Sequence, residues 1–121
     1  MGIAVMGIAV TNNPMVRDKL PRTEFHDTDY LGVLKAVRDR IHLGHKLLTH
    51  PLSGSIKPGE MPYKSVIISA GKGSLDEKSL AIVEESIQSC QKFSRTCPKR
   101  DYSAKILADF QLIDYDLIAS F

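Results

Sequence analysis

Apolar and polar positions alternate in blocks along this chain, and the blocks predict strands that are separated by helices. Residues 6–10 form an apolar run that stops at a Thr-Asn-Asn-Pro turn, as expected of a strand buried on both faces. Residues 65–70 contain three consecutive β-branched side chains and predict a central strand. Weaker patterns predict an edge strand at 23–26 and a third strand, in chain order, at 45–49.

Helical spacing of apolar residues fills the segments between and after these strands. A proline at its first position suits a short helix over 14–20, and a longer amphipathic helix is predicted over 30–41, ended by Gly44. A Ser-x-x-Glu capping box predicts a helix from 74 to about 93. Apolar residues three or four apart over 101–121 predict a last helix, either continuous or broken once.

Strands that alternate with helices predict an α/β fold. We expect a Rossmann-like or flavodoxin-like three-layer sandwich, with about four mostly parallel strands and helices on both faces. The length of 121 residues suits a single domain over 1–121. Because MGIAV occurs twice in succession, residues 1–5 are either a start-site extension or an added segment.

Composition narrows the partners and the location. The chain has 16 basic and 14 acidic residues, so its net charge of +2 does not predict binding to nucleic acid or to a membrane surface. The apolar start lacks a basic region and is too short to span a bilayer, which favours a cytoplasmic location. Cys90 and Cys97 match neither a redox motif nor a zinc knuckle, so reduced thiols are expected, with no metal and no cofactor.

Polar residues follow each predicted strand and form the candidate ligand site. Loops at the carboxyl ends of parallel strands converge at one edge of a sheet, where ligands bind. Amides, hydroxyls, imidazoles and lysines at that edge would suit a small polar or anionic ligand. The candidate ligand-binding residues are Asn12, Asn13, His26, His50, Ser53, Ser55, Lys57, Lys72 and Ser74.

Each candidate also has an ordinary structural explanation. Asn12 and Asn13 suit a turn, and Ser74 suits a helix cap. The glycine-containing segment 71–74 lacks both the P-loop and the dinucleotide-binding pattern. The histidines have no nucleophile at a recognisable spacing, so the catalytic residues stay unknown. The loop over 51–63 is rich in Ser, Gly and Pro, which fits a mobile surface loop as well as a binding loop.

Four segments carry a family resemblance: VTNNP at 10–14, VRD at 37–39, GHKLLTHPLSGSIKP at 44–58 and PYKS at 62–65. In these segments the chain resembles the GrdX family, small proteins of the glycine reductase operons of anaerobes that ferment amino acids. The resemblance implies association with reductive cleavage of glycine, sarcosine or betaine, a pathway with selenoprotein and thioredoxin components. It assigns no catalytic residue.

Three functional hypotheses follow. The first is an accessory or regulatory protein of glycine reductase metabolism, which binds a small ligand or a reductase component through the loops at the strand ends. The second is a small enzyme that uses His50 or His26 as acid or base. The third is a structural homodimer that buries Leu117, Ile118 and Phe121.

Overall fold

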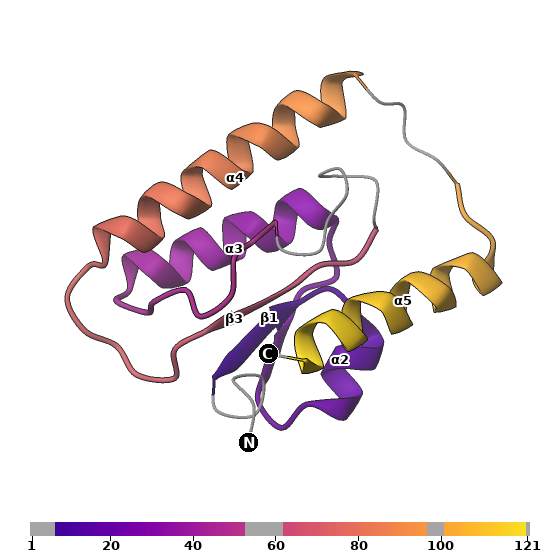
Figure 1. The fold of residues 1–121 in the computed structure, drawn as a ribbon, viewed down its shortest axis with the longest axis horizontal. Coiled ribbons are helices and arrows are strands. Elements are labelled where there is room, and N and C mark those ends of the chain that lie inside the picture. The colour runs from indigo at the N-terminus through magenta and orange to yellow at the C-terminus, as the bar shows by residue number, and fades with distance from the viewer. Residues whose placement is uncertain (1–6, 53–61, 97–100, 121) are drawn as a thin grey trace.

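The computed structural model describes residues 7–52, 62–96 and 101–120, and gives the backbone alone for 94–96. Figure 1 shows a small sheet flanked by helices, with the long helix α4 lying along α3. In chain order the elements are β1 (Ile8–Thr11), α2 (Pro14–Lys19), β2 (Thr23–Phe25), α3 (Tyr30–His42), β3 (Ser65–Ile68), α4 (Glu77–Thr96) and α5 (Ala104–Ala119). None of the described helices combines the length and apolarity needed to cross a membrane.

The sheet differs from the predicted one in strand number and direction. The described residues form a three-stranded sheet in the order β2-β1-β3, in which β1 is parallel to β2 and antiparallel to β3. The expected Rossmann-like or flavodoxin-like sandwich with about four mostly parallel strands is therefore wrong. β3 is also not central, because β1 lies in the middle. Apolar runs predict burial of a strand on both faces, but they carry no information about its direction.

The predicted strand at 45–49 is also wrong, because this segment pairs with β3 only irregularly. Leu47 makes one isolated antiparallel bridge to Ile68. The Ile67 carbonyl then accepts both the Leu48 and the Thr49 N–H, while the Ile67 N–H donates to the Thr49 hydroxyl at 3.0 Å. The Thr49 hydroxyl thus accepts a hydrogen bond that a backbone carbonyl would accept in a regular strand pair. The segment covers the outer edge of β3 without forming a strand.

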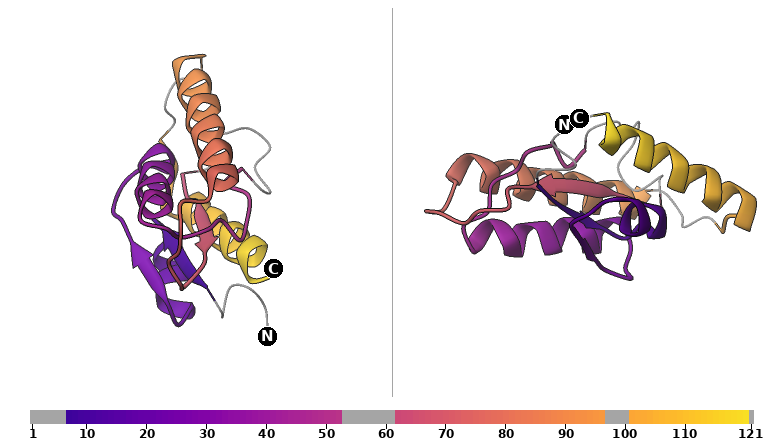
Figure 2. Two further views of the ribbon diagram at one scale, coloured as in Figure 1. Left: turned by 90° about the vertical axis from the view of Figure 1, so that its left-hand side faces the viewer. Right: turned by 90° about the horizontal axis from the view of Figure 1, so that it is seen from below.

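The two faces of the sheet bury different helices, as strand alternation requires. Val10, Val66 and Ile68 pack with the apolar stripes of α3 and α4 in one core cluster. Ala9 and Ile67 face the other way and pack with Val16 of α2 and Ile118 of α5. The end views in Figure 2 show this arrangement, with α5 on the opposite side of the sheet from α3 and α4.

Polar side chains begin the helices, and one cap differs from the prediction. Asn13, Asp29 and Ser103 accept backbone N–H groups at the starts of α2, α3 and α5. At α4, Asp76 accepts the Ser79 N–H at 3.2 Å in place of the predicted cap at Ser74. The helix therefore begins at Glu77, three residues after its predicted start. α5 is continuous over Ala104–Ala119.

Gly44 ends α3, as predicted, and its backbone has a φ of 108°. A Cβ built at this position would lie 2.3 Å from the Gly73 carbonyl oxygen, which is a backbone atom and cannot turn away. Gly44→Ala is therefore expected to lower the free energy of unfolding by about 2 kcal/mol, from strain and from this clash. Urea denaturation measures the loss. Gly71→Ala is the matched control, since a Cβ there meets nothing within 4 Å; an equal loss in both variants would contradict the explanation.

Candidate functional site

The Asn12-Asn13 pair after β1 joins three separate segments of the chain. The Asn12 amide donates to the carbonyls of Thr28 at 2.8 Å and of Pro62 at 2.9 Å, and its oxygen accepts the Lys64 N–H at 2.9 Å. The Asn13 amide instead points toward α5 and donates to the Gln111 carbonyl at 2.9 Å. Both asparagines thus act within the fold, beyond the turn-forming role expected of them.

Asp114 is the centre of the buried polar network on the α5 side of the sheet. This carboxylate is 3% exposed. It accepts the Asn13 amide at 3.0 Å, the Ser65 hydroxyl at 2.7 Å and the Ser65 N–H at 3.1 Å. Burial raises the pKa of Asp114, although these hydrogen bonds and the charge of Lys64 act in the opposite direction.

The network continues into β1 through hydroxyl groups. Ser65 Oγ lies 2.7 Å from Thr11 Oγ1. Because Ser65 gives its proton to Asp114, Thr11 must donate to Ser65, and Thr11 in turn accepts the Asn13 N–H at 2.9 Å. Every hydroxyl and amide of this network therefore has a partner. The hydrogen bonds run in one direction, from Thr11 to Ser65 and from Ser65 to the Asp114 carboxylate.

Lys64 precedes β3 and is 5% exposed, which is rare for a lysine. Burial lowers the pKa of Lys64 to about 8, and the negative charge of Asp114 opposes that shift. Its ammonium lies 5.9 Å from the centre of the Tyr30 ring, so the amine extends to the α3 side of the sheet. Near neutral pH a cation is thus held largely out of contact with water, which costs free energy.

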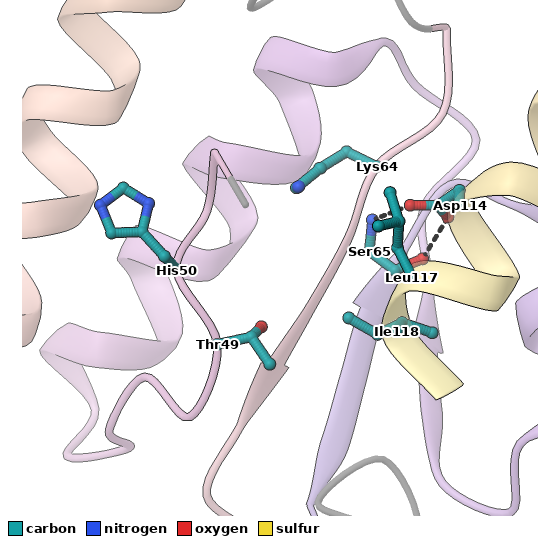
Figure 3. Close-up of a pocket in the computed structure, with 7 residues that line it drawn as sticks. All are labelled: Thr49, His50, Lys64, Ser65, Asp114, Leu117 and Ile118. Atoms are coloured by element: carbon teal, nitrogen blue, oxygen red, sulfur yellow. Dashed lines mark hydrogen bonds between the residues drawn. The ribbon is translucent and has the colours of Figure 1, made fainter. Parts of the chain in front are cut away.

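A pocket brings Lys64 and Asp114 together with the residues that follow the 45–49 segment. It is lined by Thr49, His50, Lys64, Ser65, Asp114, Leu117 and Ile118, and Figure 3 shows the lysine amine extending away from Asp114 toward the side where His50 lies. The space open within it is about 10 Å³, close to the minimum for one water molecule. As the side chains lie, nothing larger than a water molecule fits between them.

The antiparallel β3 decides which predicted residues share this end of the sheet. The exits of β1 and β2 lie beside the start of β3, so Asn12 bonds to the Lys64 N–H, Asn13 bonds to Asp114, and His50 lines the pocket with both Lys64 and Asp114. His50 is exposed, and its Nδ1 accepts the Leu52 N–H at 3.1 Å.

His26 also follows a strand at this end but does not line the pocket. Its Nε2 lies 2.7 Å from Glu24 Oε2, and Arg40 Nη2 lies 2.6 Å from the other oxygen of Glu24. Burial acts to raise the pKa of Glu24, but the bonds to His26 and Arg40 outweigh it, and the pKa is lowered. The Glu24–Arg40 ion pair links β2 to α3, and His26 contacts the same carboxylate.

The remaining candidates lie elsewhere or are not described. Lys72 and Ser74 are exposed and follow the far end of β3, where the Gly73 N–H donates to the Gly44 carbonyl at 2.9 Å. The structure therefore does not bring them to the pocket. The residues outside the described ranges are Ser53, Ser55 and Lys57 of the candidate site and Cys97, whose predicted companion Cys90 lies buried in α4.

Lys64 and Asp114 were missed by the sequence analysis. Asp114 is an acidic residue on the buried stripe of an apolar helix, between Phe110 and Ile118, and that mismatch is the signal that could have revealed it. Lys64 directly precedes β3, at the end of a strand, where a charged side chain ordinarily reaches solvent. Nothing in its sequence position indicates burial.

The described residues hold no group of three or more His, Cys, Asp or Glu side chains placed to bind a metal ion.

The model of the family described as GrdX-like protein matches residues 8–121, nearly the whole chain. Among curated proteins and solved structures, none matches the chain.

Proposed function

The chain belongs to the GrdX-like protein family, and from that premise we propose that it is an accessory or regulatory protein of glycine, sarcosine or betaine reductase metabolism. In this role its pocket beside Lys64 binds a small anionic group. The observation that supports this proposal is the burial of Lys64 at a pocket that also contains two hydroxyl-bearing residues and His50.

The cost of keeping this lysine buried supports a role in binding. A charged amine with 5% exposure lowers stability, and a leucine or methionine would fill the same space without that cost. The carboxylate of Asp114 is already occupied by Asn13 and Ser65 on the other side of β3. An incoming carboxylate or phosphate would find positive charge at Lys64 and a hydroxyl donor at Thr49, whose oxygen accepts the Ile67 N–H.

The size of the pocket limits the ligand class. At about 10 Å³ the open space holds at most one water molecule, so the carboxylate shared by glycine, sarcosine and betaine enters only when the lining side chains move apart, with the rest of the molecule outside the pocket. The pocket does not fit a nucleotide or another large cofactor within the described residues. The ligand-binding roles of Ser53, Ser55 and Lys57 stay predictions, because these residues lie outside the described ranges.

Calorimetric titration with glycine, sarcosine, betaine, acetyl phosphate and phosphate tests this proposal. We expect one of these compounds to bind below pH 8 through its carboxylate or phosphate group and to bind about tenfold more weakly for each pH unit above it, because Lys64 loses its proton near pH 8. Lys64→Met should abolish binding, whereas Lys72→Met, at an exposed lysine far from the pocket, should not. Binding that survives in Lys64→Met, or no binding by any of the five compounds, would contradict the proposal.

A second candidate function is acid–base catalysis by His50. It is favoured over a role for His26 because His50 lines the pocket, whereas His26 is engaged with Glu24 on another surface. NMR spectra of each mixture over several hours would distinguish catalysis from binding. Conversion of the added compound that disappears in His50→Ala would favour the enzyme, and an unchanged compound favours the binding protein.

A further inference from the structure

Lys64 lies one residue beyond the paired part of the sheet, at the point where β1 has already ended. The register between β1 and β3 stops at the pair Thr11 and Ser65. At the next position the Lys64 N–H donates to the side-chain oxygen of Asn12 at 2.9 Å. A side chain thus accepts the hydrogen bond that a backbone carbonyl would accept in a longer strand pair, and it extends the pairing of β3 by one residue.

Asn12 also holds the backbone on the other side of Tyr63. Its amide donates to the Pro62 carbonyl at 2.9 Å and to the Thr28 carbonyl, just before α3, at 2.8 Å. Asn12 is 6% exposed, so these bonds lie largely out of water. The bonds to Pro62 and Lys64 together fix the direction of the chain as it enters β3.

The extended backbone at Lys64 decides which face of the sheet receives its side chain. Side chains alternate along a strand, and those of Val66 and Ile68 pack with α3 and α4. Lys64 precedes Val66 by two residues and points to the same face, where its ammonium lies 5.9 Å from the centre of the Tyr30 ring; Figure 3 shows it extending away from Ser65. At an unpaired strand end the same lysine would turn to solvent and avoid the cost of burial.

From these contacts we propose that Asn12 is a positioning residue, whose hydrogen bonds hold Lys64 in its buried place beside the pocket. Asn12 contacts the backbone of residues 62 and 64 and acts on a bound anion through Lys64. This role deepens the proposed anion binding and rests on it. The position of Lys64 can nevertheless be measured without any ligand.

An NMR titration of the lysine Cε signals tests this role, with the Lys64 signal identified by its loss in Lys64→Met. In Asn12→Ala the pKa of Lys64 should rise from about 8 to above about 9, toward the 10.5 of an exposed lysine. Gly44→Ala, which strains the opposite end of the sheet, is the matched control and should leave this pKa unchanged. An unchanged pKa in Asn12→Ala, or an equal rise in Gly44→Ala, would overturn the proposal.

The titratable groups around Lys64 stay in place in this comparison. Within the described ranges, Tyr30 of α3, His50 and Asp114 of α5 face the lysine. The charge of Asp114 raises the pKa of Lys64, and the hydrogen bonds of this carboxylate are made to side chains and backbone other than those of Asn12. A higher pKa in Asn12→Ala therefore means that Lys64 has left its buried place.

Hydrogen exchange in the wild-type protein gives a test that needs no variant to fold. Because Asn12 accepts the Lys64 N–H, this amide should exchange at least about tenfold more slowly than an amide without a hydrogen bond. Exchange as fast as that of an unbonded amide would show that the start of β3 frays, and would overturn the role of Asn12.

Binding of inorganic phosphate and of glycine at pH 7 separates this role from the proposed function. Either probe that binds the wild type should bind Asn12→Ala about tenfold more weakly, because Lys64 is no longer held at the pocket. Equal affinity in the two proteins would overturn the role of Asn12. If neither probe binds the wild type while Asn12→Ala still raises the pKa of Lys64, the placement of Lys64 by Asn12 stands and the anion site fails.

Discussion

Asp114→Ala is expected to lower the free energy of unfolding by about 3 kcal/mol, a large share of the stability of a small domain. The substitution leaves the Ser65 N–H, the Ser65 hydroxyl and the Asn13 amide without their buried acceptor. Donors without partners in the interior cost more than the hydrogen bonds themselves contribute. It also removes the negative charge that favours the protonated form of Lys64. Urea denaturation at pH 7 measures the loss.

Two further variants separate the network from a general effect of replacing an aspartate in a helix. Asp39→Ala removes an exposed aspartate from α3 and should change the free energy of unfolding by less than about 0.5 kcal/mol. Asp114→Asn keeps the shape but turns one acceptor into a donor, so its loss should fall between the other two. A loss in Asp114→Ala as small as that in Asp39→Ala would show that the carboxylate does not hold α5 to the sheet.

Much of the secondary structure follows from local patterns. The edge strand, the proline-initiated helix and the end of α3 at Gly44 are confirmed within one or two residues, because each depends on neighbours in sequence. The direction of β3 does not depend on neighbours. It is decided by the path of the chain between α3 and β3, and the apolar run at 66–68 looks the same in either direction.

The direction of β3 also explains which residues of the candidate site the sequence analysis grouped correctly. Polar residues after β1 and after Thr49 do meet at one end of the sheet, which places His50 beside the pocket. Lys72 and Ser74 were grouped with them only because a parallel β3 was assumed, and the antiparallel strand carries them to the other end. Lys64 lies before β3, so its arrival at the pocket is a consequence of that reversal.

The titration of Lys64 predicts a rise in stability at alkaline pH. The pKa of Lys64 is about 8 in the folded protein, whereas the ordinary pKa of an exposed lysine is 10.5, so between these values the unfolded chain binds a proton that the folded chain does not. Stability therefore increases as pH rises through this window. From pH 7 to 10.5 the contribution of Lys64 to the free energy of unfolding grows by about 3 kcal/mol.

Comparison with Lys64→Met isolates this contribution, because methionine fills the space without a titrating group. The difference in free energy of unfolding between the two proteins, measured by urea denaturation at several pH values, should shift by about 3 kcal/mol in favour of the wild type between pH 7 and 10.5. The difference in free energy of unfolding between the wild type and Lys72→Met should not change with pH, since both proteins keep the buried amine. A level difference for Lys64→Met as well would mean that Lys64 titrates as an exposed lysine does. The amine would then lack the buried environment on which the proposed anion site depends.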